Sequence, residues 1–201
     1  MKTGKTVKVL LALTTAAGML AGCGSKTDTD TFRFASELDI QGMDSTVVDD
    51  GMSFNAIHAI TDGLTAVNEK GKTAPAIAKS WDVSDDGKTY TFHLRDAKWS
   101  NGDKVTANDF VYSWRKIIKD AGNYAYMLGN GGASVKNADA LMELGANATD
   151  EQMATLGVTA KDDKTLVVEL ENKVPYFTDL MAFPCYFPQS EKFVEKCGEN
   201  Y

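Results

Sequence analysis

The sequence has few of the side chains that enzymes use for catalysis or metal binding. It contains two histidines, His58 and His93, and three cysteines among 201 residues. None of these lies at the spacing of a zinc site or of a nucleophile paired with a base. A glycine-rich phosphate loop is also absent from the sequence. We therefore expect no metal and no cofactor, and interpret both histidines as structural.

Basic residues are outnumbered, with 21 Lys and Arg against 28 Asp and Glu, for a formal net charge of -7. An acidic chain binds phosphate backbones poorly, so nucleic acid is not expected as a partner. The composition is 43% hydrophobic and 24% charged, which is typical of a folded protein. The length fits one large domain, or one domain with an accessory unit.

Long apolar runs are rare as well. The one at Val9–Leu20 has twelve residues, too few to span a bilayer as a stable helix. Three lysines precede it, and Leu20-Ala-Gly-Cys23 follows it and matches the bacterial lipobox, in which the cysteine is diacylated. We expect a lipoprotein signal peptide over 1–22 and a lipidated Cys23, with a flexible tether over 23–31. This predicts anchoring to the outer face of the bacterial cell membrane.

The most informative stretch covers residues 90–118, YTFHLRDAKWSNGDKVTANDFVYSWRKII. Apolar and polar side chains alternate over its first five residues, which predicts a half-buried strand. Asn101-Gly102 predicts a turn, and Thr106 with Asp109 resembles a capping box, so a helix is expected from about Ala107. That helix carries one apolar stripe at helical spacing: Phe110, Val111, Trp114, Ile117 and Ile118.

Other segments predict further strands and helices, and therefore an α/β fold with mixed sheets. Strands are expected at 31–36, just after 62–63, and in hairpins over 81–94 and 157–170. A helix capped by Ser53 or Asn55 is expected through Ile60, with Phe54, Ile57 and Ile60 facing inward. Further helices are predicted over 135–144, after a capping box at 149–152, over 175–183 and over 189–196.

The segment HLRDAKWSNGDKVTANDFVYSW resembles the signature segment of the extracellular peptide-binding proteins of ABC transporters, the oligopeptide- and dipeptide-binding family (bacterial solute-binding protein family 5). It joins a strand, a Trp-Ser-x-Gly turn and a Thr-Ala-x-Asp-Phe helix start in the family's order. Segments near Asp62, Pro75–Trp81, 157–166 and Val174–Phe177 are similar to family segments too. The segment 43–45 departs from the pattern, because it lacks the family's proline.

The resemblance implies a periplasmic-binding-protein-like fold of two lobes that close over a ligand. On this basis, residues 32–61 begin the first lobe, 62–187 form an accessory α/β domain, and 188–201 return to the first lobe. Members of the family are more than twice as long, so the second lobe is absent and the chain is interpreted as an N-terminal fragment.

The same resemblance implies the ligand-binding residues. The segment Asp49, Asp50, Gly51 and Met52 corresponds to one that bonds to the peptide main chain, and Tyr124 corresponds to a tyrosine that faces the ligand. The alternatives are an acidic surface loop for the first and a tyrosine that packs its loop onto the core for the second. Separately, Cys185 and Cys197 form a disulfide or stay free, because sequence cannot establish the geometry.

The function implied is capture of extracellular oligopeptides by a monomeric lipoprotein, which delivers them to the permease subunits of an ABC importer. No bond is made or broken by such a subunit, so we expect no enzyme activity. The alternatives are another cargo on the same scaffold (a dipeptide, a signalling peptide, a nickel chelate or haem), a lipid-anchored surface hydrolase, or a complete adhesion or sensing module.

Overall fold

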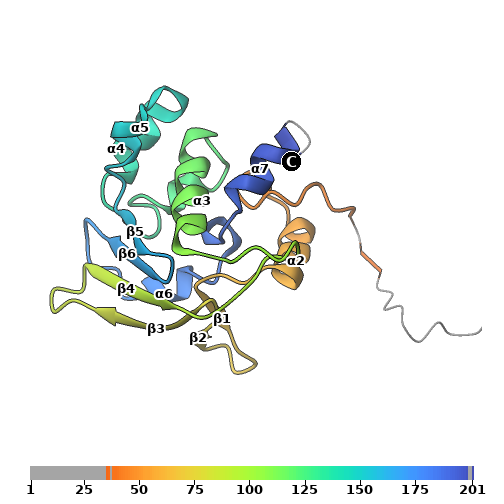
Figure 1. The fold of residues 1–201 in the computed structure, drawn as a ribbon, viewed down its shortest axis with the longest axis horizontal. Coiled ribbons are helices and arrows are strands. Elements are labelled where there is room, and N and C mark those ends of the chain that lie inside the picture. Colours follow the sequence, from red (N-terminus) through yellow and green to blue (C-terminus); the bar gives the residue numbers. More distant parts are fainter. Residues whose placement is uncertain (1–34, 37, 199–200) are drawn as a thin grey trace, which may run out of the picture. The chain divides into compact units, whose positions relative to one another are not determined.

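A four-stranded antiparallel sheet in the order β3-β4-β6-β5 organises the described part of the chain (Figure 1). It is built from two hairpins, which pair through β4 and β6 with Tyr90 opposite Val168. Both hairpins were predicted, and both are confirmed. The strands are β3 (Ala78–Val83), β4 (Thr89–Leu94), β5 (Val158–Asp162) and β6 (Thr165–Glu169), and a separate hairpin joins β1 (Thr65–Val67) to β2 (Thr73–Pro75).

The computed structural model describes residues 35–36, 38–198 and 201. By their contacts, Leu38–Tyr201 form one unit, which contains every helix and strand named here. The expected signal peptide, Cys23 and most of the predicted strand at 31–36 lie outside the described residues, and Ala35 and Ser36 are not in a strand. Among the described helices, none has the length and apolar character needed to cross a membrane.

Helix α3 packs against β5 and β6 (Figure 1). It carries the predicted apolar stripe. It begins at Ala107, as predicted, because the Asp109 carboxylate accepts a hydrogen bond of 2.7 Å from the backbone N–H of Thr106. All five stripe residues are buried, and so are Phe92 and Leu94 of β4. The helices are α2 (Gly51–Ile60), α3 (Ala107–Lys119), α4 (Ala138–Leu144), α5 (Asp150–Met153), α6 (Phe177–Leu180) and α7 (Glu191–Cys197), with short 3-10 turns η1 (Ala125–Met127), η2 (Gly145–Asn147) and η3 (Pro184–Tyr186).

Helix boundaries differ from the prediction where a contact distant in sequence intervenes. The helix expected from residue 135 begins at Ala138, because Val135 instead forms a β-bridge with Leu170. The helix expected over 175–183 is only α6, and the carbonyl of Thr178 within it accepts a hydrogen bond from the Thr65 hydroxyl. Propensity was therefore overridden by tertiary pairing at both sites.

Buried apolar side chains form two clusters. The larger one draws its buried members from Leu64 to Tyr186, and the smaller one contains Val48, Ile57 and Phe187. The division falls close to the predicted boundaries at 62 and 187, which nevertheless stay predictions. The segment before β1 thus contributes Val48 and Ile57 to the smaller cluster.

Candidate functional site

The predicted ligand segment 49–52 lies where the chain enters α2, next to the loop that follows α3. The Asn123 side-chain amide joins the two, since its Nδ2 donates to the Asp49 carboxylate at 3.0 Å and to the carbonyl of Val47 at 3.1 Å. Tyr124 is the next residue in that loop. The structure therefore brings together the two parts of the candidate site, which are distant in sequence.

Three aromatic rings meet beside this segment. Tyr124 lies 5.3 Å from Phe54 and 5.2 Å from Phe183 between ring centroids, and the last two are 5.1 Å apart. Tyr126 stacks on Tyr124 at 6.0 Å, with 52% of its surface exposed. Tyr124 itself is half-buried and packs against the larger core. Tyr124 thus packs its loop onto the core, as the alternative interpretation expected, and part of its ring stays accessible.

Sequence reasoning did not assemble this aromatic cluster. Phe54 was predicted to face inward, and Phe183 was placed at the end of a predicted helix. Nothing local connects them, because they meet only when η3 and α2 pack together. Ile60 was also predicted to face inward, yet it is 72% exposed.

Asp50 has a structural role that the sequence did not predict. Its carboxylate caps α2 by accepting a hydrogen bond of 2.8 Å from the backbone N–H of Ser53, so the helix starts at Gly51 rather than after Ser53 or Asn55. The hydrogen bonds from Ser53 lower the pKa of Asp50. Its contact with ligand stays a prediction, as do those of Asp49, Gly51 and Met52. Asp49 and Gly51 are exposed and Met52 is half-buried.

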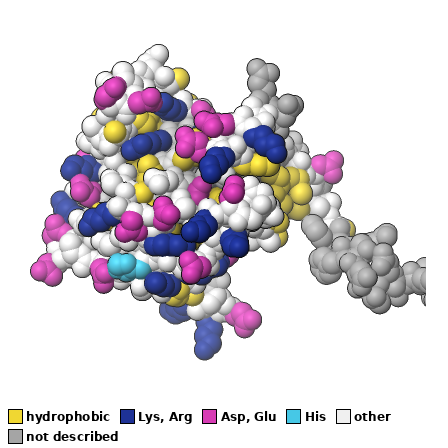
Figure 2. Space-filling view, viewed as in Figure 1, with side chains coloured by type: hydrophobic (Ala, Val, Ile, Leu, Met, Phe, Trp, Pro, Cys, Tyr) yellow, Lys and Arg dark blue, Asp and Glu magenta, His cyan; other side chains and the backbone are white. Residues whose placement is uncertain are grey.

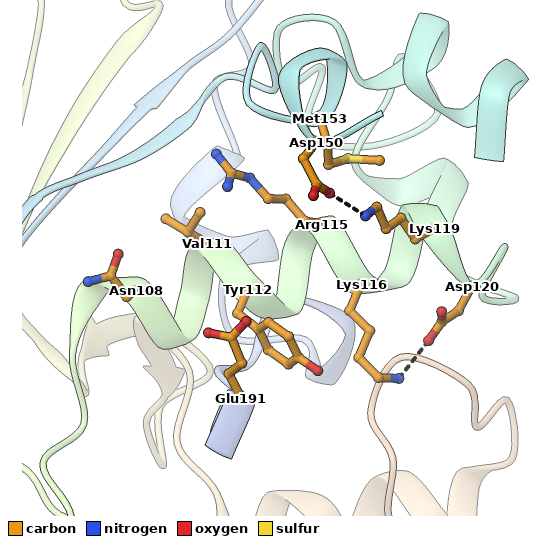
Figure 3. Close-up of a pocket in the computed structure, with 10 residues that line it drawn as sticks. All are labelled: Asn108, Val111, Tyr112, Arg115, Lys116, Lys119, Asp120, Asp150, Met153 and Glu191. Carbon is orange, nitrogen blue, oxygen red and sulfur yellow. Dashed lines mark hydrogen bonds and ion pairs between the residues drawn. The ribbon is translucent and has the colours of Figure 1, made fainter. Parts of the chain in front are cut away.

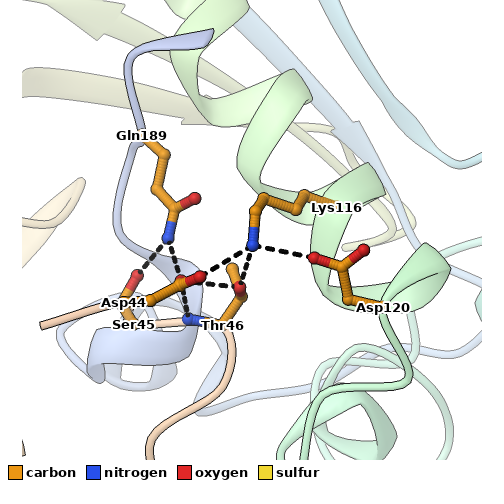
Figure 4. A network of polar contacts seen from close by, with 6 residues as sticks. All are labelled: Asp44, Ser45, Thr46, Lys116, Asp120 and Gln189. Atoms are coloured by element: carbon orange, nitrogen blue, oxygen red, sulfur yellow. Dashed lines mark hydrogen bonds and ion pairs between the residues drawn. The ribbon is translucent and has the colours of Figure 1, made fainter. Parts of the chain in front are cut away.

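A polar network anchors the chain just before the candidate site (Figure 4). The Lys116 ammonium donates to the Asp44 carboxylate and to the Thr46 hydroxyl, at 2.8 Å and 2.9 Å, and pairs with Asp120 at 2.8 Å. The other oxygen of Asp44 accepts from Gln189 at 2.6 Å. The side chains of Lys116 and Asp44 are each only 13% exposed. The network therefore joins three segments largely out of contact with water.

The contacts within this network shift the pKa values of both Asp44 and Lys116. Burial raises the pKa of Asp44, but the hydrogen bonds from Lys116, Thr46 and Gln189 outweigh it and leave that pKa below its ordinary value of 3.8. Burial lowers the pKa of Lys116, but Asp120 and Asp44 outweigh it and leave that pKa above 10.5. Both groups are therefore charged across the neutral range.

These directions predict how stability depends on pH. Because the folded-state pKa of Asp44 is depressed, its contribution is complete above the ordinary pKa and is lost as pH falls through the lowered value. At pH 7 we expect Asp44→Asn to cost about 1.5–3 kcal/mol, as for a hydrogen bond to a charged group. Urea unfolding should show this difference shrinking towards pH 2. Parallel pH profiles for the two proteins would contradict the assignment.

Two hollows near α3 and α2 do not contain the predicted ligand residues. One, of about 510 Å³, lies along α3 beside α5 and is lined by charged side chains such as Lys119 and Asp150, which pair at 2.7 Å (Figure 3). The other, of about 480 Å³, is mainly apolar and is lined by α2 and α7 residues including Ile60 and Phe193. Figure 2 shows hydrophobic side chains gathered near these helices, on a face that elsewhere mixes both charges.

The described residues contain no group of three side chains arranged to hold a metal ion. Of the two alternatives left open for Cys185 and Cys197, the structure has the unpaired one, because both are free thiols. The physical reason is placement: Cys185 is fully buried in the larger core, whereas Cys197 is half-buried at the end of α7, outside that core. Burial also raises the pKa of the Cys185 thiol, which makes it unreactive.

Known proteins resemble this chain in sequence. The dipeptide-binding protein of Lactococcus lactis subsp. cremoris is 38% identical over 205 aligned residues, which cover 100% of this chain and 36% of that protein. The oligopeptide-binding protein OppA of Bacillus subtilis is 42% identical over 153 residues, which cover 75% of this chain and 26% of that protein. The chain therefore spans little more than a third of the length of such relatives.

Solved structures resemble it as well. The substrate-binding domain of an oligopeptide ABC transporter from Bacillus anthracis matches with a TM-score of 0.76 and 41% identity, over 84% of this chain and 31% of that one. Listeria monocytogenes OppA bound to peptide matches with a TM-score of 0.72 and 40% identity, over 79% of this chain and 30% of that one. The predicted mixed helix-and-sheet, periplasmic-binding-protein-like fold is confirmed.

A family match agrees with these likenesses. Residues 72–200 match the family described as "Bacterial extracellular solute-binding proteins, family 5 Middle". That range is more than half of the chain and includes the signature segment from which the resemblance was inferred. The family consists of solute-binding proteins rather than enzymes. The chain thus belongs to the bacterial extracellular solute-binding proteins of family 5.

Proposed function

We propose that the chain is part of a lipoprotein that captures oligopeptides outside the cell membrane and delivers them to the permease subunits of an ABC importer. The observation that carries this proposal is the likeness, at about 40% identity, to structures of oligopeptide-binding proteins. One of them, OppA of Haemophilus influenzae, is in complex with the nonapeptide RPPGFSPFR. A peptide-binding role is the simplest one that these likenesses share.

The candidate site suits a peptide of variable sequence. Asp49 and Gly51 of the segment 49–52 are exposed. In the proposal, backbone groups of the segment recognise a peptide main chain without regard to its side chains. Tyr124 and Tyr126 add flat apolar faces with hydroxyl groups, which contact many side chains at low entropic cost. The exposed carboxylate of Asp49 adds negative charge beside them. In the proposal these groups form one wall of the site, and the rest of the protein supplies the other.

The proposal includes a lipid anchor at Cys23 and a monomeric protein at the outer face of the membrane. It is supported by the lysines, apolar run and lipobox of the first 23 residues. Two acyl chains give lasting attachment, whereas one gives only marginal binding. A mature protein whose N-terminal fragment lacks the mass of the added lipid would contradict this part of the proposal.

Calorimetry tests peptide binding with the complete protein that carries this chain. We expect heat of binding from a mixture of tri-, tetra- and pentapeptides. Tyr124→Ala should weaken affinity roughly two- to twelvefold, because an aromatic contact contributes about 0.5–1.5 kcal/mol. Tyr176→Ala is the control, since Tyr176 is an exposed tyrosine, at 53%, that belongs to neither part of the candidate site, and it should leave affinity unchanged. Absence of heat from peptides, with binding of a nickel chelate or haem instead, would refute the peptide assignment.

A dipeptide cargo is the second candidate. It is favoured by the dipeptide-binding protein of Lactococcus lactis, whose alignment covers the whole of this chain. Titrating dipeptides and tetrapeptides separately distinguishes the two, because the tighter ligand identifies the cargo class. A peptidase activity removed by one substitution would instead favour the surface hydrolase.

A further inference from the structure

Helix α3 and the loop after it hold the segment that leads to the candidate site. Three contacts follow each other along residues 44–49. Lys116 bonds to Asp44 and Thr46, the backbone at Gly122 lies against the carbonyl of Thr46, and Asn123 bonds to Val47 and Asp49. The route of the chain into α2 is therefore set by a helix that belongs to a different part of the sequence.

All three N–H donors of the Lys116 ammonium have acceptors in this network. An ammonium group has three N–H donors, and three acceptors surround this one: Asp44 and Asp120 at 2.8 Å and Thr46 at 2.9 Å. Thr46 is 1% exposed, so water does not readily replace the lysine there. A charged group with all its donors satisfied in a buried site fixes the atoms around it more firmly than an exposed ion pair does.

Both N–H donors of the Asn123 side chain also have acceptors in the segment. A side-chain amide nitrogen has two donors, and those of Asn123 reach the carbonyl of Val47 and the carboxylate of Asp49. Lys116 and Asn123 thus bond to the segment on either side of the buried Val48. Together with Asp50, which caps α2, they provide contacts at Asp44, Thr46, Val47, Asp49 and Asp50.

We propose that Lys116 and Asn123 act as a clamp that positions residues 49–52, and that this positioning raises the affinity for ligand. The inference rests on the proposed function, because it takes segment 49–52 as a ligand contact. Neither Lys116 nor Asn123 needs to touch the ligand in this role. The clamp acts by holding the segment in its bound conformation before ligand arrives, which reduces the ordering that binding requires.

The test compares Lys116→Met and Asn123→Ala with the unchanged complete protein. Amide hydrogen exchange at 47–52 and affinity for a mixture of tri-, tetra- and pentapeptides of alanine and of lysine are measured together. We expect exchange to become at least tenfold faster and affinity about tenfold weaker in each variant. The double variant should lose less than the product of the two single losses, because both act on the same segment.

Lys119→Met is the matched control. It removes an ion pair from the same helix, that of Lys119 with Asp150 at 2.7 Å, but it leaves the segment 44–49 untouched. Its exchange at 47–52 and its affinity should stay within twofold of the unchanged protein. Equal losses in Lys119→Met and Lys116→Met would show a general destabilisation of α3 and overturn the clamp.

The outcomes separate the clamp from the proposed function. Faster exchange at 47–52 with unchanged affinity in Asn123→Ala overturns the clamp, because a freed segment then has no effect on binding. If Lys116→Met does not fold, Asn123→Ala carries the test alone, since Asn123 lies on the surface. An unchanged protein that binds no peptide refutes the proposed function, while the exchange rates still show whether the segment is held.

Discussion

Replacing Trp114 with alanine should be the most destabilising single change in the described part of the chain, at about 3–5 kcal/mol. Its side chain is completely buried, and its indole N–H donates to the carbonyl of Tyr186 at 3.0 Å. The change therefore removes a large apolar volume and leaves a buried carbonyl without its donor. Because domains of this size are stable by about 5–15 kcal/mol, the loss is a large fraction of the total.

Trp81→Ala is the matched control for this prediction. Trp81 is only half-buried, on β3, where its ring lies 6.1 Å from that of Phe92. Chemical denaturation should give a loss smaller than that of Trp114→Ala by at least about 2 kcal/mol. Trp114→Phe should recover most of the packing but not the hydrogen bond. Similar losses at both tryptophans would mean that Trp114 does not hold α3 to η3.

Local signals were sufficient for the elements around Trp114. The alternation of Tyr90, Phe92 and Leu94 predicted β4, and the capping box at Thr106 predicted the first residue of α3. In both cases the signal and the structure that it specifies lie within a few residues of each other. Local propensity, hydrophobic period and burial agree there, which is the condition under which a sequence specifies structure clearly.

The start of α2 shows where local reasoning failed. Asp49, Asp50, Ser53 and Asn55 all belong to residue types that cap helices, so propensity does not choose among them. In the structure Asp50 caps the helix, while Asn123 binds the Asp49 carboxylate. That contact crosses 74 sequence positions, and no periodicity in the sequence encodes it.

The sequence predicted the residues of the candidate site, but not the contacts that bring them together. The residues of segment 49–52 and Tyr124 were named from a family resemblance, while their proximity could come only from the structure. The network of Lys116, Asp44 and Gln189 had no sequence signal, because its members lie 72 and 145 positions apart. Hydrophobic periodicity and capping patterns describe residues within one helix or strand. They do not predict these contacts, which join loops to a helix.

Gly122→Ala should disturb the candidate site more directly than any change in the core. A Cβ atom at this position would lie 2.0 Å from the carbonyl oxygen of Thr46 and 2.8 Å from a side-chain carbon of Ile117. The first of these is backbone that Lys116 holds in place, so relief requires the segment 44–49 to move away from α3. Overpacking of this kind costs about 1–3 kcal/mol.

Movement of segment 44–49 away from α3 should affect ligand binding as well as stability. Since Asn123 also holds Asp49, the displacement should extend to residues 49–52, and we expect affinity for peptide to fall at least tenfold. Denaturation and calorimetry of the complete protein measure the two effects. Gly51→Ala is the control for stability, because a Cβ there meets no heavy atom within 4 Å.

Alanine in the first turn of α2 should instead stabilise the protein by up to about 1 kcal/mol, because glycine loses more backbone entropy on folding. The same substitution thus has opposite expected signs at two glycines near one site. If Gly122→Ala were as stable as Gly51→Ala and bound peptide as tightly as the unchanged protein, the close approach of α3 to Thr46 would not position the segment.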